Sequence, residues 1–214
     1  ALMRTSTQAQ IPLLFGAVSD PIGAGLEGAK GVTDMIAFPP LVKRIREVFP
    51  EATTIGVIYS AGEANSITQV TDFKKAAAAE NFQVIEKSVL RSTDAQAAFD
   101  SLAEKVDLVF TPTDNLIISA ANVLIQRSFV HKTPIISANR DPVEKGALMA
   151  FGVDYYEQGK MIASQIIDLL KGKNIDELGI LTQDQVDFFV NLKSADKLGV
   201  AIPEDVLKQA KEMY

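Results

Sequence analysis

The sequence predicts an α/β fold with mostly parallel sheets, and two observations carry this prediction. Short runs rich in β-branched residues alternate with amphipathic helical patterns along most of the 214 residues. Strands and helices that alternate in this way form right-handed βαβ units, in which successive strands are parallel. With 47% hydrophobic residues, the chain is also long enough for one large domain or two smaller lobes.

The predicted elements follow one another without long gaps. Six segments have the composition of strands: 11–18, 53–60, 82–90, 106–113, 133–139 and 147–153. Helical patterns lie at 39–49, 65–82, 93–105, 116–132, 154–173 and 203–213. Asn65 or Ser66 is expected to cap the second helix, and Asp154 the fifth. Residues 53–139 supply enough elements for one three-layer lobe, whereas residues 1–31 cannot form a domain alone.

The composition excludes several classes of function. A net charge of −6 disfavours a nucleic-acid partner, because an acidic surface repels phosphates. The absence of cysteine excludes thiolate zinc sites, disulfides and cysteine nucleophiles, and we expect no cofactor. No apolar run approaches the ~20 residues that a membrane span needs. Residues 1–10 do not have the order of a signal peptide, so we expect a cytosolic protein or one whose targeting segment is removed.

A formal G-x-G-x-x-G match at Gly23, Gly25 and Gly28 raises the question of dinucleotide binding. That fingerprint needs its first glycine directly after a strand, and here Ser19-Asp20-Pro21 intervenes. It also needs an acidic residue at the end of the next strand, and 53–60 ends in Tyr-Ser. The context therefore argues against a nucleotide-binding loop.

Small polar and acidic residues follow every predicted strand, at the sheet edge where ligands bind in open α/β folds. The helix N-terminus at Asn65 and Ser66 could hold a carboxylate through its N–H groups and dipole. The carboxylates of Glu63, Asp114 and Asp154 could hold an ammonium group. Together these groups suit a zwitterionic ligand such as an amino acid, although the same residue types also serve as helix caps and turns.

Several stretches, in order along the chain, carry a family resemblance: IPLLFGAVSDPIGAGL, TTIGVIYSAGEANSITQV, VDLVFTPTDN, TPIISANRDPVEKGALMAFGVDYYEQGKMIA and VNLKSADKLGVAIPEDVLKQA. The most specific parts are GEANS and GALMAFGVDYYEQG. The sequence resembles the ABC transporter substrate-binding proteins of the tryptophan- and tyrosine-binding type. That group is a branch of the type I periplasmic-binding-protein fold.

The resemblance implies two three-layer α/β/α lobes with parallel sheets, joined by a multi-segment hinge. Residues 1–31 and 142–174 would form the first lobe, and 32–141 and 175–214 the second. The first lobe is expected to begin upstream of this chain and so to be incomplete at its N-terminus. The first segment that would cross from one lobe to the other departs from the family pattern. The family more often has an Asn-Val-Thr-Gly-like turn at this place, and this chain has Gly31-Val32-Thr33-Asp34.

The resemblance also implies a function, that of an extracytoplasmic solute-binding component of an ABC importer. Such a protein would close its lobes around an amino acid, aromatic by this resemblance, and deliver it to a membrane permease without catalysis. We expect a monomer in the periplasm or lipid-anchored on the outer face of the membrane, with the signal segment absent from this chain. The expected ligand-binding residues are Ser19, Asp20, Glu63, Asn65, Ser66, Thr113, Asp114, Asn115, Asn139, Asp154 and Tyr155.

Two alternatives stay open at this point. The chain could be the ligand-sensing domain of a two-lobed regulator, which would need a DNA-binding segment elsewhere. It could also be an amino-acid racemase or isomerase on a similar scaffold. The sequence contains no nucleophile–base pair or phosphate loop in support of an enzyme, and its one histidine, His131, is expected at the surface near a helix end.

Overall fold

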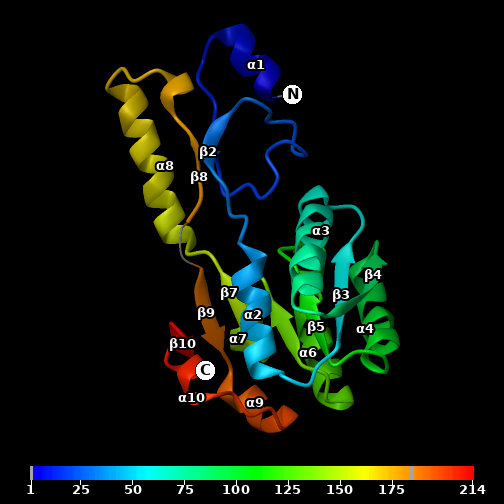
Figure 1. The fold of residues 1–214 in the computed structure, drawn as a ribbon. Coiled ribbons are helices and arrows are strands. Elements are labelled where there is room, and N and C mark those ends of the chain that lie inside the picture. The colour runs from blue at the N-terminus through cyan, green and yellow to red at the C-terminus, as the bar shows by residue number, and fades with distance from the viewer. Residues whose placement is uncertain (1, 184–185) are drawn as a thin grey trace. The chain divides into compact units, whose positions relative to one another are not determined.

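The computed structural model describes residues 2–183 and 186–214. The chain forms two compact units (Figure 1). Unit 1 comprises Ala1–Ile36 and Val153–Val186, and unit 2 comprises Ala37–Gly152 and Asp187–Tyr214. The chain therefore passes from one unit to the other at three places, after Ile36, Gly152 and Val186, as a multi-segment hinge requires.

The boundaries between the two units fall at other residues than the lobe boundaries suggested by the sequence. Residues 142–152, expected in the first lobe, belong to unit 2, because strand β7 (Met149–Gly152) pairs with β6 (Ile135–Ser137) and β9 (Asp187–Val190). Residues 175–186, expected in the second lobe, belong to unit 1, because β8 (Ile180–Leu181) pairs with β2 (Lys30–Val32). Residues 32–36 also belong to unit 1.

Unit 1 is built on a parallel three-stranded sheet in the order β1-β2-β8, where β1 is Leu14–Gly16. Helix α8 (Tyr155–Leu170) packs against β1 and β2. The unit also contains α1 (Leu2–Ala9) and the short 3₁₀-helix η2 (Ile175–Glu177). Gly31 pairs with Phe15 at a φ of 153°, and a Cβ atom there would lie 2.0 Å from the Phe15 carbonyl oxygen. This close approach explains why β2 carries a glycine.

Unit 2 contains a seven-stranded sheet in the order β10-β9-β7-β6-β5-β3-β4. Strands β3 to β7 are parallel, as the sequence predicted, and β9 runs antiparallel to β7. The bounds of the other strands are β3 Thr54–Ser60, β4 Gln83–Val89, β5 Leu108–Thr111 and β10 Glu212–Met213. The bounds of the helices are α2 Phe38–Val48, α3 Ala64–Ala79, η1 Ser92–Asp94, α4 Ala95–Ala103, α5 Asn115–Ser119, α6 Ala121–His131, α7 Asp141–Lys145, α9 Leu192–Leu198 and α10 Glu204–Leu207.

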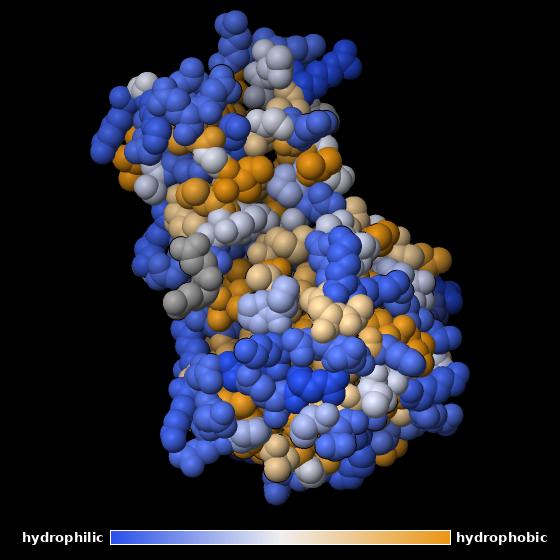
Figure 2. All heavy atoms as spheres, viewed as in Figure 1, coloured by the Kyte–Doolittle hydropathy of each residue, from blue (hydrophilic) through white to orange (hydrophobic). Residues whose placement is uncertain are grey.

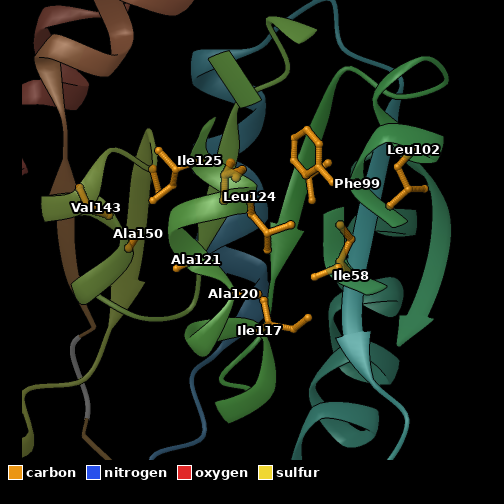
Figure 3. Packing of buried hydrophobic residues seen from close by; sticks show 14 of the residues in the cluster. Ile58, Phe99, Leu102, Ile117, Ala120, Ala121, Leu124, Ile125, Val143 and Ala150 are labelled. Atoms are coloured by element: carbon orange, nitrogen blue, oxygen red, sulfur yellow. The ribbon is translucent and has the colours of Figure 1, made fainter. Parts of the chain in front are cut away.

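Two cores flank the large sheet and make unit 2 three-layered. On one face, Phe110 of β5 stacks on Phe73 of α3 at 4.0 Å between ring centroids, and Phe38 of α2 meets both edge-on. On the other face, Val109 and Ile58 pack in a cluster with residues of α4, α5 and α6 (Figure 3). Neighbouring residues of β5 thus face opposite layers, as the pleat of a strand requires.

Some predicted elements differ from the observed ones. The helix expected at 116–132 is divided at Ala120 into α5 and α6. The strand expected at 11–18 is reduced to the three residues of β1, and the last helix to the four of α10. The short strands β2, β8, β9 and β10 were not predicted.

Polar residues cover most of the surface that Figure 2 shows, with apolar residues in separate groups. Among the helices of the described residues, none combines the length and the hydrophobicity that crossing a membrane requires.

Candidate ligand-binding site

Asp114 is the centre of a hydrogen-bond network in unit 2. It follows β5 and is only 1% exposed. Its Oδ2 atom accepts hydrogen bonds from the Ser60 backbone N (2.5 Å) and the Ser66 hydroxyl (2.7 Å). Its Oδ1 atom accepts from the Ile117 backbone N at 2.9 Å. Asp114 therefore links the end of β3, the first turn of α3 and the start of α5.

Glu63 completes the capping of α5 together with Asp114. Its carboxylate accepts from the backbone N of Asn115 (3.1 Å) and of Leu116 (3.1 Å), and from the Asn115 side chain (3.0 Å). These two acidic residues thus satisfy three backbone N–H groups at one helix start, where intrahelical acceptors are lacking.

The two carboxyl groups have pKa values shifted in opposite directions. Burial acts to raise the pKa of Glu63, but hydrogen bonds from Asn115, Leu116 and Asn65 outweigh it and hold that pKa below its ordinary value. Burial raises the pKa of Asp114, and the charge of Glu63 adds to this rise. The hydrogen bonds to Asp114 act in the opposite direction without cancelling the effect of burial.

The N-terminus of α3 differs from the prediction. The helix begins at Ala64, so Asn65 and Ser66 lie in its first turn, and neither is the cap residue. The Ser66 side chain is fully buried, with its hydroxyl donating to Asp114. The Asn65 side chain donates to the Thr113 carbonyl oxygen at 2.8 Å. In the described part of the chain, no acceptor meets the backbone N–H groups of residues 64–66. These donors can therefore bind an anion.

Asn139 follows β6 in the same sheet. Its backbone N donates to the Ser137 hydroxyl at 3.1 Å. Its side-chain Nδ2 is buried and has no hydrogen-bond partner among residues 2–183 and 186–214. A buried amide donor without a partner is uncommon in folded proteins, so this atom is a candidate for contact with a ligand.

In unit 1, two of the predicted residues, Ser19 and Tyr155, donate hydrogen bonds to the same carboxylate. It belongs to Asp34, which the sequence did not mark as a binding residue. Asp34 is 6% exposed, and its Oδ1 atom accepts from the Ser19 hydroxyl at 2.6 Å. Its Oδ2 atom accepts from the Tyr155 hydroxyl at 3.3 Å. The only sequence signal for Asp34 was that an acidic residue stands in the first segment crossing between the lobes, where the family turn was expected.

The other two acidic candidates of unit 1 cap local structure. Asp20 accepts from the Gly23 backbone N at 2.8 Å and closes a turn. Asp154 accepts from the backbone N of Tyr156 (2.9 Å) and of Glu157 (3.2 Å), so the predicted cap of α8 is confirmed.

The glycine-rich stretch is a series of turns. Hydrogen bonds such as that from the Leu26 backbone N to the Pro21 carbonyl oxygen close the turns, and no helix begins within residues 21–28. A Cβ atom on Gly23 would lie 2.5 Å from the Asp20 carboxylate, so a larger residue there would displace the carboxylate that closes this turn. This geometry lacks the helix start that a dinucleotide fingerprint needs.

The structure thus joins Glu63, Asn65, Ser66, Thr113, Asp114 and Asn115 in one network of unit 2. It joins Ser19 and Tyr155 through Asp34 in unit 1. Asn139, Asp20 and Asp154 make separate contacts. Within the described residues there is no cluster of side chains that could hold a metal ion. The participation of these residues in ligand binding stays a prediction.

Solved structures with clear sequence similarity share this fold. A conserved domain protein from Vibrio cholerae superposes with a TM-score of 0.87 at 33% identity, over 95% of this chain and 72% of that one. An ABC domain from Streptococcus pneumoniae in complex with L-Trp gives a TM-score of 0.86 at 30% identity, over 95% of this chain and 74% of that one.

Sequence comparison agrees with the structural one. A Clostridioides difficile protein named tyrosine-binding protein is 32% identical over 197 residues, which are 87% of this chain and 57% of that protein. The chain spans less than 60% of the length of the curated relatives it matches. The sequence profile of the family described as ABC transporter substrate binding protein matches residues 1–214. The chain therefore belongs to the family of ABC transporter substrate-binding proteins.

Proposed function

We propose that the protein carrying this chain binds an aromatic amino acid and delivers it to an ABC permease for import. Family membership supports the transport role. The name of the Clostridioides difficile relative and the L-Trp complex of the Streptococcus pneumoniae domain support the ligand class. In this proposal the protein acts as a monomer in the periplasm or anchored on the outer face of the membrane, and no catalytic step is involved.

The observation that carries the proposal is the first turn of α3. Its N–H groups lie at the carboxyl edge of a parallel sheet and have no acceptor in the described part of the chain. A 16-residue helix places partial positive charge at this end. A ligand carboxylate would bind these N–H groups, with Asn65 beside them and Asn139 supplying an amide donor.

The remaining predicted residues have two proposed roles. The buried Ser66 and Asp114, together with the half-buried Glu63, hold the first turn of α3 and the start of α5 in place. Thr113 and Asn115 line the ligand. Ser19, Asp20, Asp154 and Tyr155 contribute contacts from unit 1. A ligand that contacts both units binds the closed arrangement more tightly than the open one. It therefore shifts the population toward the closed state.

Isothermal titration calorimetry against the twenty amino acids tests this function. We expect one or more aromatic L-amino acids to bind and acidic and basic ones to fail. Asn65→Ala should weaken binding about tenfold, because the Asn65 side chain donates to the Thr113 carbonyl oxygen and so holds the first turn of α3 against the loop that lines the ligand. Gln96→Ala, on the exposed face of α4, is the matched control and should bind as the wild type does. If no aromatic amino acid binds, the proposed function is wrong.

A further inference from the structure

We propose that Asp34 is the acceptor of the ammonium group of the amino-acid ligand, with the Ser19 and Tyr155 hydroxyls as two further acceptors of the same group. This inference rests on the proposed function and names the residues that recognise one end of the ligand. All three residues belong to unit 1.

The first argument is charge. Asp34 is only 6% exposed, and no Lys, Arg or His among the described residues forms an ion pair with it. A buried carboxylate is costly unless a cation or several hydrogen-bond donors compensate its charge. The two hydroxyl groups on Asp34 are neutral and compensate it in part. A ligand ammonium group would supply the missing positive charge.

The second argument is the kind of donor. Backbone N–H groups have fixed directions. Such groups donate hydrogen bonds to the carboxylates of four other acidic residues: Asp20, Glu63, Asp114 and Asp154. The two oxygens of the Asp34 carboxylate accept instead from hydroxyl groups. A hydroxyl can rotate, and its oxygen can also accept hydrogen bonds. An ammonium group with three N–H donors therefore matches one carboxylate oxygen and two hydroxyl oxygens.

The third argument is positioning. The Thr33 hydroxyl donates to the Ser19 carbonyl oxygen (3.4 Å) and accepts from the Met35 backbone N (3.1 Å). The Gln158 side chain of α8, itself buried, donates to the Thr33 carbonyl oxygen at 3.0 Å. These contacts fix the backbone on both sides of Asp34. The carboxylate is thus held in place before the ligand arrives, which lowers the entropic cost of binding.

The same reasoning separates Asp34 from Glu63 and Asp114, two of the three residues that the sequence suggested for the ammonium group. The third, Asp154, caps α8. Glu63 and Asp114 are close to each other, and their oxygens cap α5. Recruiting either carboxylate for an ammonium group would take acceptors away from the start of that helix. Asp34 has no such capping role.

The test compares L-tryptophan with 3-(indol-3-yl)propanoate, which lacks only the ammonium group, by calorimetric titration. Wild-type protein should bind L-tryptophan at least about tenfold more tightly than the analogue. In Asp34→Asn this preference should be lost, through about 10- to 100-fold weaker binding of L-tryptophan and little change for the analogue. Glu157→Gln also removes one negative charge from unit 1, at an exposed residue paired with Lys160, and should keep the wild-type preference.

Several outcomes would overturn the inference. Unchanged affinity of Asp34→Asn for L-tryptophan would exclude an ammonium contact, and equal weakening of both ligands would assign Asp34 a purely structural role. The preference of the wild type can be measured even if the variant does not fold, and tight binding of the analogue by the wild type would also reject the proposal. Wild-type protein that binds no aromatic amino acid refutes the proposed function itself, so the two failures are distinguishable.

Discussion

The Ser66 hydroxyl donates a 2.7 Å hydrogen bond to the Asp114 carboxylate, and both side chains are almost completely buried. This contact joins the first turn of α3 to the residue that caps α5. Because both side chains are buried, their hydrogen bond is a structural link between the starts of α3 and α5. It also holds these helix starts against the end of β3, since Asp114 accepts from the Ser60 backbone N as well.

Removing that hydroxyl should destabilise the protein. In Ser66→Ala, one of the three donors to a buried carboxylate is lost, so we expect the free energy of unfolding to fall by about 1–3 kcal/mol. Urea denaturation followed by circular dichroism measures the change. Ser119→Ala removes an exposed hydroxyl bonded within its own helix and should change stability by no more than about 0.5 kcal/mol. Equal stability of the two variants would contradict the structural role of Ser66.

The lowered pKa of Glu63 predicts a pH-dependent contribution to stability. Its ionised form is favoured in the folded protein, so its contribution is present above the ordinary glutamate pKa of about 4.3 and is lost as the pH falls through the lowered folded value. In Glu63→Gln this contribution is absent. We therefore expect the stability difference between wild type and variant to be largest near neutral pH and to shrink in acid. A difference that is constant with pH, in denaturant titrations from neutral pH into the acid range, would argue against this assignment.

The sequence predicted the layered architecture of unit 2 well because the signal is local. The central strands are continuous apolar runs, and residues such as Ile55, Val57 and Leu108 are fully buried. The helices beside them have regular apolar spacing. The short strands β2, β8 and β10 carry no such signal, since a two- or three-residue strand forms only through neighbours distant in the sequence. The break at Ala120 has no local cause in the sequence either, because alanine favours helix.

The candidate site could be predicted by residue type but not by role. Polar residues do follow the strands, yet whether a carboxylate caps a helix depends on its tertiary partner. Glu63 occupies the cap position of α3, but its side chain caps α5, whose first residue is 52 positions away. Asp34 was not selected because its partners Ser19 and Tyr155 lie 15 and 121 positions away. Local pattern contains no information on such pairs.

Gly31 and Gly159 provide a pair of glycines with opposite expected effects. Gly31→Ala would place a Cβ atom against the Phe15 carbonyl oxygen, which belongs to the neighbouring strand backbone, so β1 and β2 must separate. We expect a loss of about 2–3 kcal/mol in the free energy of unfolding. Gly159 lies in α8, and beyond the backbone of its own helix no atom comes within 4 Å of the place a Cβ would take, so Gly159→Ala should stabilise by about 0.5–1 kcal/mol. Thermal unfolding of both variants tests the pair, and a stable Gly31→Ala protein would refute the close approach of the strands.

Asn139 should separate binding from stability. Its buried Nδ2 atom has no partner in the described residues, so Asn139→Ala removes an unsatisfied donor and should change the free energy of unfolding by less than about 0.5 kcal/mol. If the amide donates to the ligand, the same substitution should weaken amino-acid binding about tenfold. Chemical denaturation and calorimetric titration of one protein preparation measure both quantities.

Asn191→Ala is the contrasting variant, because the Asn191 side chain donates to the Val143 carbonyl oxygen and accepts from the Ser194 backbone N. It should lose about 1–3 kcal/mol of stability. An Asn139→Ala protein with reduced stability and unchanged affinity would show that this amide supports the fold and does not bind the ligand.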